Sequence, residues 1–412
     1  MHVLIIGGGL AGPALALFLK KAGITSTIYE AYPQLENIGG ALQIAPNGMK
    51  VMAALGLAKE VIANGSVSSE FRFYDHHGKR LASLKNGNFE KVGQPAVSIA
   101  RNTFHRILTR EAEKQGIRLE YQKRLSKISY PDDKKVQAHF EDGTTAEGDI
   151  LVGADGIRSI TRQLILPDSP APVYTGFLGL GGFVPRSTVR SLGMTPAEQD
   201  NLHMVFGPSG FFGYGGANQE MMWWVNFESP EETNQKELPS LTNEEIRRKL
   251  LSRYSGWAEP VETMLKQEQA IVKTAIYTMP SLPTWHNRRV ILIGDAAHAL
   301  SPTSGQGASM ALEDAMYLAK LLAQSSDQPE QIFTSFEQGR RGRVEKINKQ
   351  ANRSNQDKKE ASPFATWLRN RFISIIMPLF GKSMFEWIHS YTIDWNVSKP
   401  SASPEVEQAK SR

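Results

Sequence analysis

Hydrophobic residues follow two different periods along this chain, and the first region combines both of them. The apolar run His2–Ile6 predicts a buried β-strand, and apolar residues then recur at helical spacing over residues 10–21. A second run rich in β-forming residues, Thr25–Tyr29, ends at Glu30. The N-terminal pattern therefore predicts a strand–turn–helix–strand unit of the Rossmann-like type.

The remaining sequence changes its pattern several times. Helical spacing predicts helices at residues 47–57, 102–114 and 311–322, and apolar or alternating runs predict strands at 68–84, 136–140, 144–147, 150–152 and 290–293. Between residues 170 and 274, glycine turns alternate with aromatic and β-branched runs, which predicts a mostly antiparallel sheet inserted into an α/β domain. Residues 364–395 predict C-terminal helices that break at Pro378, and the polar sequence after Lys399 predicts a disordered tail.

The composition and charge exclude several classes of function. A chain of 412 residues is long enough for two or three packed units. It contains no cysteine, which excludes disulfides, thiolate nucleophiles and Cys-ligated zinc or iron–sulfur centres, and its nine histidines show no spacing that indicates a metal site. Basic residues are in excess at 339–382, which we interpret as a solvated helix face and not as a nucleic-acid site.

The sequence does not indicate export or membrane insertion. The first apolar run is too short for the hydrophobic region of a signal peptide, and glycines follow it at once. The apolar segment 372–380 contains Pro378 and is far too short to span a bilayer. We therefore expect a cytoplasmic protein without stable membrane insertion, and the sequence leaves its oligomeric state open.

A glycine motif fills the predicted turn after the first strand. In Gly7-Gly8-Gly9-Leu10-Ala11-Gly12 the first glycine allows a tight bend, the third lets the backbone approach a phosphate, and the last lets helix and strand pack closely. The helix N-terminus attracts a pyrophosphate, and Glu30 at the end of the second strand is placed to bind a ribose diol. This motif does not distinguish FAD from NAD. The residues that we predict to bind the dinucleotide are Gly7, Gly9, Leu10, Ala11, Gly12 and Glu30.

Two later motifs favour FAD over NAD. Gly153-Ala154-Asp155-Gly156 follows one predicted buried strand, and Gly294-Asp295 follows another. Asp295 can accept hydrogen bonds from ribityl hydroxyls, and Pro302 then redirects the chain. Gly305 and Gly307 precede a predicted helix, so their amides can face a flavin ring and stabilise the negative charge of its reduced form. An ordinary glycine N-cap is the alternative explanation for these last two residues.

The order and spacing of the three motifs, over most of the first 350 residues, resemble the FAD fingerprint, the DG motif and the GD motif of single-component (class A) FAD-dependent aromatic monooxygenases. Gly39-Gly40-Ala41 and Pro46-Asn47-Gly48 also resemble the salicylate- and urate-hydroxylase-like members. The resemblance implies that Arg101 contacts FAD, that Asp155 serves both FAD and nicotinamide-cofactor binding, and that residues 305–307 lie by the flavin ring. It also implies that NADPH or NADH binds transiently, because no second Rossmann unit is predicted.

The motifs and the resemblance together predict the domain organisation. We expect an α/β fold, with a Rossmann-like FAD-binding domain, an inserted, mostly antiparallel β-sheet substrate domain and C-terminal helices. The boundaries are 1–68, 98–168 and 275–350 for the FAD-binding domain, 69–97 and 169–274 for the substrate domain, 351–398 for a helical cap and 399–412 for the tail. We expect most aromatic residues of the inserted sheet to form its core and a few to touch a planar substrate. These residues are Phe206, Phe211, Phe212, Tyr214, Trp223 and Trp224.

The reaction implied by the resemblance is a hydroxylation. NADPH or NADH reduces non-covalently bound FAD, O2 forms a flavin C4a-hydroperoxide, and a small aromatic or heteroaromatic substrate is hydroxylated. The sequence does not identify a catalytic side chain. Three alternatives stay open: antibiotic inactivation by a tetracycline-type flavin monooxygenase, a flavin reductase or dehydrogenase of the same fold, and a non-catalytic FAD-dependent regulator.

Overall fold

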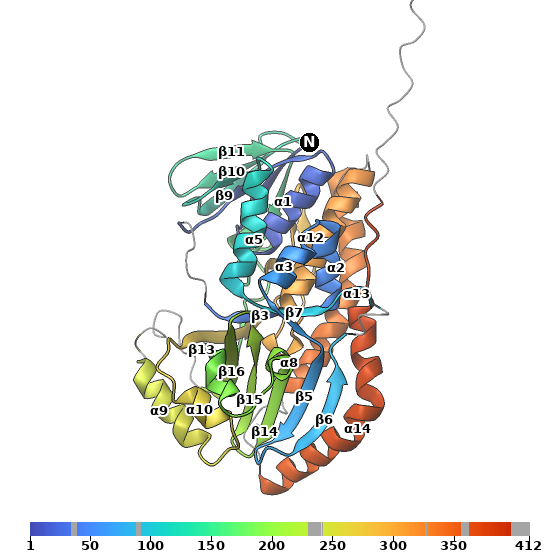
Figure 1. The fold of residues 1–412 in the computed structure, drawn as a ribbon. Coiled ribbons are helices and arrows are strands. Elements are labelled where there is room, and N and C mark those ends of the chain that lie inside the picture. Colours follow the sequence, from blue (N-terminus) through green and yellow to red (C-terminus); the bar gives the residue numbers. More distant parts are fainter. Residues whose placement is uncertain are drawn as a thin grey trace, which may run out of the picture.

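The computed structural model describes residues 1–33, 39–87, 92–229, 240, 242–325, 328–355 and 362–396. Figure 1 shows two regions, one around the N-terminus and one built on a larger sheet, with helix α14 running along the second. Within the described ranges, no helix is both long enough and apolar enough to cross a membrane. The predicted tail at 399–412 lies outside the described residues, and the predicted domain boundaries stay a prediction.

The first region is built on a six-stranded sheet in which every central pair of strands is parallel. The strand order is β18-β19-β12-β1-β2-β8, and only the short edge strand β18 runs antiparallel to its neighbour. Helix α1 directly follows β1, so the predicted N-terminal strand–turn–helix–strand unit is confirmed. The strands are β1 (His2–Ile6), β2 (Thr25–Tyr29), β8 (Arg118–Glu120), β12 (Ile150–Gly153), β18 (His286–Asn287) and β19 (Val290–Leu292).

Helices cover this sheet and enclose the largest apolar cluster of the described chain. Buried residues of β1, α1 and α12 form its centre, and α1 packs on α12. The helix predicted at 47–57 is confirmed as α2, but it ends at Ala54, before a turn in which Gly56 has φ +80°. The helices of this region are α1 (Ala11–Lys21), α2 (Pro46–Ala54), α3 (Ala58–Ala63), α5 (Arg101–Lys114), α6 (Ile160–Ile165), α11 (Asp295–His298), α12 (Gly307–Gln324) and α13 (Pro329–Asn355).

Two small sheets border the first region. The order β11-β10-β9 contains the predicted hairpin, with Ala138 opposite Ala146, so that prediction is confirmed. The order β3-β7-β4 carries the chain from the first region to the second. The strands are β3 (Ala41–Ile44), β4 (Ser66–Ser68), β7 (Ala96–Ala100), β9 (Leu125–Ser129), β10 (Val136–Phe140) and β11 (Thr145–Gly148).

The second region is built on a seven-stranded sheet in the order β17-β13-β16-β15-β14-β5-β6. All neighbouring strands are antiparallel except β14 and β5, which pair in parallel with Leu202 opposite Phe71. The predicted mostly antiparallel sheet is therefore confirmed. The strands are β5 (Glu70–Asp75), β6 (Arg80–Lys85), β13 (Val173–Pro185), β14 (Leu202–Gly207), β15 (Gly210–Ala217), β16 (Glu220–Glu228) and β17 (Val272–Thr278).

The two faces of this sheet bury different apolar clusters. One cluster joins the sheet to the helices α7, α9 and α10, which the sequence pattern did not predict. The other cluster combines aromatic residues of the sheet with Ile373, Met377 and Phe385 of α14. A fourth helix that was not predicted, α8, packs on β15. The bounds are α7 (Arg186–Arg190), α8 (Pro196–Asp200), α9 (Asn243–Arg253) and α10 (Val261–Leu265).

The C-terminal helix corrects a prediction. α14 (Pro363–His389) is one helix with Pro378 inside it, so the predicted break at Pro378 is wrong, and residues 390–396 are not helical. A proline inside a helix removes a backbone hydrogen bond and crowds the carbonyl one turn earlier. Pro378 is exposed, so water can hydrogen-bond that carbonyl, while the opposite side of α14 is held by packing on β6.

Candidate active site

A cavity of about 1790 Å³ connects the two regions. Pockets for single small ligands are typically about 300–1,000 Å³, so this volume has room for a dinucleotide together with a substrate. Gly12 lies behind the wall, in the first turn of α1. The other predicted cofactor-binding residues all border the cavity: Gly7, Gly9, Leu10, Ala11, Glu30, Arg101, Asp155, Asp295, Pro302, Gly305 and Gly307.

The glycines after β1 differ in what surrounds them. Gly7, at φ +112°, lies against the backbone of Ala154, and a Cβ on Gly12 would collide with the carbonyl oxygen of Gly7. A Cβ on Gly9 would meet no atom within 4 Å. Gly7 and Gly12 are therefore required for close packing of strand, turn and helix, whereas Gly9 leaves room on the cavity side for a phosphate.

Glu30 holds the same turn from the end of β2. Its Oε2 accepts a 2.7 Å hydrogen bond from the Gly8 amide, and its Oε1 accepts one of 2.9 Å from the Tyr32 amide. The residue is 9% exposed and borders the cavity. The carboxylate is thus fixed by backbone donors at the position where the fold expects a ribose ligand.

His105 is a residue of this end that the sequence did not single out. It lies on α5, is buried, and its Nε2 is 2.6 Å from the carbonyl oxygen of Gly8. The contact joins α5 to the glycine turn, so His105 holds the carbonyl of Gly8 while Glu30 holds its amide. Its only signal in the sequence is its place on the apolar face of the predicted helix at 102–114.

Asp155 follows β12 and uses its carboxylate within the chain. Oδ1 accepts a 2.5 Å hydrogen bond from the Ser159 hydroxyl, and Oδ2 accepts hydrogen bonds of 2.9 Å from both the amide and the hydroxyl of Thr161. Burial raises the pKa of Asp155, while these hydrogen bonds lower it. The carboxylate therefore shapes the turn between β12 and α6 where that turn borders the cavity.

Asp295 begins α11 directly after Gly294, which has φ +58°. The Gly294 amide donates a 2.9 Å hydrogen bond to Asp314 Oδ2, which also lies 2.6 Å from His298 Nε2, and Asp314 Oδ1 accepts one of 2.7 Å from Arg340 Nε. Burial would raise the pKa of Asp314, but His298 and Arg340 lower it to about 2. This buried carboxylate fixes the Gly294 turn and therefore the position of Asp295.

The loop before α12 presents backbone to the cavity. Gly305 has φ +59°, and neither Gly305 nor Gly307 would place a Cβ within 4 Å of another atom. α12 starts at Gly307 without a side-chain hydrogen bond at its N-cap and without an acidic residue in its first turn. A helix N-terminus of this kind stabilises a negative charge placed before it, such as the N1–O2 edge of a reduced flavin.

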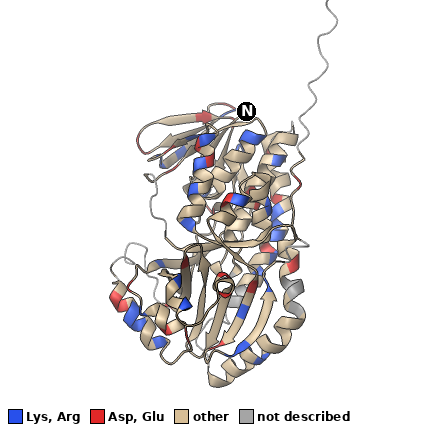
Figure 2. Cartoon of the chain, viewed as in Figure 1, with Lys and Arg blue, Asp and Glu red and all other residues tan. Residues whose placement is uncertain are grey.

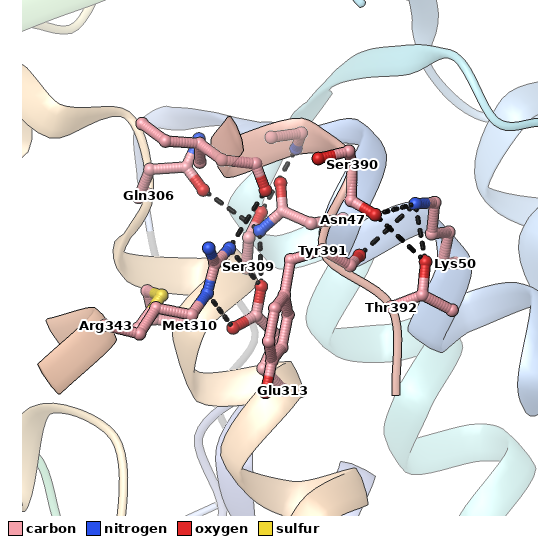
Figure 3. A network of polar contacts seen from close by, with 12 residues as sticks. Asn47, Lys50, Gln306, Ser309, Met310, Glu313, Arg343, Ser390, Tyr391 and Thr392 are labelled. Atoms are coloured by element: carbon pink, nitrogen blue, oxygen red, sulfur yellow. Dashed lines mark hydrogen bonds and ion pairs between the residues drawn. The ribbon is translucent and has the colours of Figure 1, made fainter. Parts of the chain in front are cut away.

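Gln306, between these two glycines, is buried and held by a polar network (Figure 3). Asn47 Nδ2 donates hydrogen bonds to Gln306 Oε1, at 3.1 Å, and to Glu313 Oε1, at 2.7 Å. Glu313 is 1% exposed and forms ion pairs with Arg340, at 2.7 Å, and Arg343, at 2.8 Å. The charge of Glu313 is thus balanced by two arginines, and the network fixes the loop that faces the cavity.

The same network reaches the end of α14. Arg343 Nη2 also donates to the carbonyl oxygen of Ile388, at 2.9 Å. Lys50 Nζ donates to the carbonyl oxygen of Ser390 and to the hydroxyl of Thr392, both at 2.8 Å (Figure 3). The C-terminal segment is therefore tied to α2 and α13, and through Glu313 to the cavity loop.

The other end of the cavity is lined by the second sheet and α14. Of the predicted aromatic residues, Phe212, Tyr214 and Trp223 belong to the core on the far face of the sheet. The lining side chains of this end are almost all apolar: Phe71, Phe73, Phe183, Leu202, Met204, Phe206, Phe211, Met222, Trp224, Leu368, Phe372, Ile373, Ile376, Met377 and Phe385.

Few polar groups border this apolar end. Arg369 Nη2 donates a 3.0 Å hydrogen bond to the carbonyl oxygen of Gly207. Burial lowers the pKa of His389 to about 4, so its imidazole is neutral at pH 7. Among the described residues, no group of three His, Cys, Asp or Glu side chains could hold a metal ion. The apolar side chains of this end can therefore pack against an aromatic ring, and Arg369 is a cationic group beside them.

The fold and the cavity define a class of protein. A glycine turn at the N-terminus of α1, an acidic residue at the end of β2 and a glycine loop at the N-terminus of α12 border one cavity with an aromatic wall. This combination of a dinucleotide site, a ring-binding loop and an apolar substrate chamber is that of a flavoprotein acting on an organic substrate.

Comparisons with known proteins agree with the assignment to flavoproteins. The model of the family described as "FAD binding domain" matches residues 1–351, and the chain belongs to this family of FAD-dependent aromatic monooxygenases. It is 30% identical over 363 residues to 6-hydroxynicotinate 3-monooxygenase of Pseudomonas fluorescens, covering 84% of this chain and 89% of that protein. It is 30% identical over 344 residues to a salicylate hydroxylase of Pseudomonas putida, covering 79% of this chain and 77% of that protein.

A solved structure has the same fold. The complex of Klebsiella pneumoniae HpxO with FAD and uric acid superimposes with a TM-score of 0.76 at 22% identity, covering 95% of this chain and 93% of that one. The predicted fold class, cofactor FAD and monooxygenase activity are therefore confirmed. The individual cofactor-binding residues stay a prediction.

Proposed function

We propose that this flavoenzyme hydroxylates a small aromatic or heteroaromatic compound, with O2 as co-substrate and NADPH or NADH as the reductant. One observation carries the proposal: the same cavity borders the loop at Gly305 and Gly307 and the aromatic wall of the second sheet. A flavin ring against that loop would therefore have its substrate face toward the wall. The relatives named for 6-hydroxynicotinate and salicylate act on single aromatic rings, which supports the substrate class.

Different residues of the chain would bind different parts of FAD. The turn at Gly7–Gly9 and the N-terminus of α1 would bind the pyrophosphate, and Glu30 would bind the adenosine ribose. Asp295 would accept hydrogen bonds from ribityl hydroxyls. The amides at the start of α12 would lie against the N1–O2 edge of the ring and stabilise its negative charge. Arg101, the first residue of α5, borders the cavity and supplies a positive charge for the phosphates.

FAD, when bound and reduced, supplies the activated oxygen that is transferred to the substrate ring. The chain's task at the other end of the cavity is to exclude water and to orient the ring. The aromatic residues of β5, β14 and β16 and the inner side of α14 provide that dry surface. His389, neutral at pH 7, can accept a hydrogen bond from a substrate hydroxyl.

The reductant has no separate domain in this proposal. Asp155 borders the same cavity, in agreement with the role in nicotinamide-cofactor binding that the family resemblance implies. We therefore expect NADPH or NADH to approach the flavin through the cavity and to leave before oxygen transfer.

The test is to purify the protein with FAD and screen phenolic and heteroaromatic compounds for those that accelerate NADPH or NADH oxidation. Product mass is then compared under ordinary and isotopically labelled O2. We expect one labelled oxygen atom in the product. Faster oxidation of the nicotinamide without oxygen in the product would overturn the proposal and favour the reductase alternative.

A further inference from the structure

α14 exposes an unusual amount of apolar surface. Six of the twelve large hydrophobic side chains that are exposed in the described part of the chain lie on this one helix. Their spacing of three or four residues places them along one side of the helix. They are Phe364 (71% exposed), Trp367 (56%), Leu368 (54%), Phe372 (56%), Ile375 (51%) and Leu379 (69%), and we call them the α14 stripe.

The charged residues of α14 up to Lys382 have one sign. The sequence of α14 contains Arg369, Arg371 and Lys382 but no acidic residue before Glu386 near its end. Figure 2 shows the α14 ribbon as mostly uncharged. The edge strand β6, on which α14 packs, begins with Arg80 and ends with Lys85, and both are exposed, although Lys85 lies opposite Glu70 of β5. An apolar stripe on a helix whose charges are mainly basic is complementary to an anionic phospholipid surface.

The stripe is continuous with the apolar end of the cavity. Leu368 and Phe372 are more than half exposed and also line the cavity, whereas Ile375 and Leu379 belong only to the stripe. A compound dissolved in the outer part of a lipid layer that contacts α14 would therefore reach the cavity past Leu368 and Phe372 without crossing water.

We propose that the α14 stripe docks on the surface of an anionic phospholipid membrane and that lipid-dissolved aromatic substrates enter the cavity there. The docking follows from the stripe and its charges alone, whereas the entry of a substrate rests on the proposed function. A second copy of the chain is a poorer occupant. In a symmetric contact the basic residues of α14 would meet their own copies, and like charges would repel.

The experiment uses the FAD-loaded enzyme and vesicle flotation, with vesicles of phosphatidylcholine alone or mixed with phosphatidylglycerol. We expect the enzyme to float with the mixed vesicles, and raised salt to weaken this binding. The double variant Ile375→Ser/Leu379→Ser should bind these vesicles at least roughly tenfold more weakly, because it removes two apolar side chains from the contact. The control Val173→Ser/Leu192→Ser changes exposed apolar residues elsewhere and should bind like the wild type.

Several outcomes would overturn the docking. They are no flotation of the wild type, equal flotation of both double variants, or light scattering that shows a dimer which only Ile375→Ser/Leu379→Ser dissociates. Melting temperatures confirm that both variants are folded. Turnover of a water-soluble substrate should be the same in both, since none of the four residues lines the cavity, so failure of docking is distinguishable from failure of the proposed function.

Discussion

The two ends of the cavity are built by different means. The cofactor end is formed by backbone at three turns, each placed directly after a strand of the parallel sheet or at the start of a helix, and each fixed by a buried acid such as Glu30, Asp155 or Asp314. The substrate end is formed by side chains from β5, β14, β16 and α14, which are far apart in sequence. Its walls are almost free of charge.

This difference shows how each end tolerates change. At the cofactor end, one added carbon atom either collides with backbone, as at Gly7 and Gly12, or takes space that the cofactor would need, as we expect at Gly9 and Gly307. At the substrate end, a side chain can be exchanged for another of similar volume with a small loss of stability, because the sheet behind it carries the backbone hydrogen bonds. The following predictions test this contrast.

The largest effect is expected at Gly12. Gly12→Val should prevent stable folding, because its Cβ would collide with the Gly7 carbonyl, a backbone atom that cannot rotate away. The loss should exceed the roughly 1–3 kcal/mol of ordinary overpacking. Gly9→Val is the matched control, since a Cβ there meets no atom within 4 Å. It should fold but bind FAD weakly, as measured by circular dichroism and FAD titration. Equal folding of both variants would contradict the prediction.

The next effect concerns the network beneath the cavity loop. Glu313→Ala removes the only carboxylate that pairs with Arg343 among the described residues and leaves Arg340 with Asp314 alone, and should lower the free energy of unfolding by about 3–5 kcal/mol. Glu345→Ala removes a carboxylate that is 54% exposed and should change stability by less than about 1 kcal/mol. Urea denaturation of both variants gives the comparison. A similar small loss for both would show that the buried network adds little.

A substitution at Gly307 should affect the flavin chemistry more than the stability of the fold. Gly307→Val should slow flavin reduction or release hydrogen peroxide without product, at a cost of roughly 3 kcal/mol in the stabilisation of the reduced ring. Its Cβ meets no atom of the chain within 4 Å, as is also true of the control Gly342→Val on α13. Melting temperature, reduction rate and peroxide yield should distinguish them. If Gly307→Val is destabilised but reduces and couples normally, the glycine serves only the start of the helix.

Acid should weaken the second region through two buried histidines. Burial lowers the pKa of both His203 and His389 to about 4. The unfolded chain binds these protons near pH 6.5 and the folded chain only near pH 4, so their stabilising contribution is complete above pH 6.5 and is lost as the pH falls toward 4. At pH 5 the loss is about 2 kcal/mol for each histidine. Urea denaturation at pH 7 and 5 measures it, and His389→Asn should show a smaller difference. An unchanged pH dependence in that variant would show that protonation of His389 does not contribute to the loss of stability in acid.

The smallest effect is expected at Glu30. Glu30→Ala removes the acceptor of the Gly8 and Tyr32 amides and the expected ribose ligand, and should weaken FAD binding by about 1–2 kcal/mol. Glu30→Gln keeps one acceptor oxygen and should lose less. Fluorescence titration of FAD gives both affinities. Equal affinity of Glu30→Ala and the wild type would show that Glu30 does not bind the cofactor.

The contrast between the two ends also explains what the sequence could predict. Motifs that bind through backbone need glycine and an acid at fixed spacing after a strand, so Gly7, Glu30 and Asp295 could be found within short segments. The structure brings them to one cavity, as expected. His105 was missed because its partner, the Gly8 carbonyl, comes from another segment, and nothing in the local pattern marks it. Asn47 was noted only as part of Pro46-Asn47-Gly48, and its hydrogen bond to Gln306, from a distant segment, could not be predicted.

The substrate end was predicted only as a mostly antiparallel sheet. The helices α7, α8 and α10 were missed because they have only five residues each, too few to show a period. The longer α9 could have been predicted, because the capping box Thr242–Glu245 and the spacing of Ile246 and Leu250 are local helix signals. The helix break at Pro378 was wrong because the rule for proline considers the backbone alone, whereas packing of α14 on β6 outweighs the lost hydrogen bond. The division of the predicted aromatic residues between cavity and core depends on strand register, which the sequence does not determine.

The pairing of β5 with β14 has a consequence for the synthesis of the protein. β5 (residues 70–75) leaves the ribosome long before its parallel partner β14 (residues 202–207). In the same way, β12 is synthesised long before its partner β19 (residues 290–292). Non-local strand pairs form late, and their exposed edges invite association until the partner arrives. Neither region can therefore be completed by an N-terminal fragment. Truncated chains should aggregate, and the yield of active enzyme should depend on chaperones that protect the early strands.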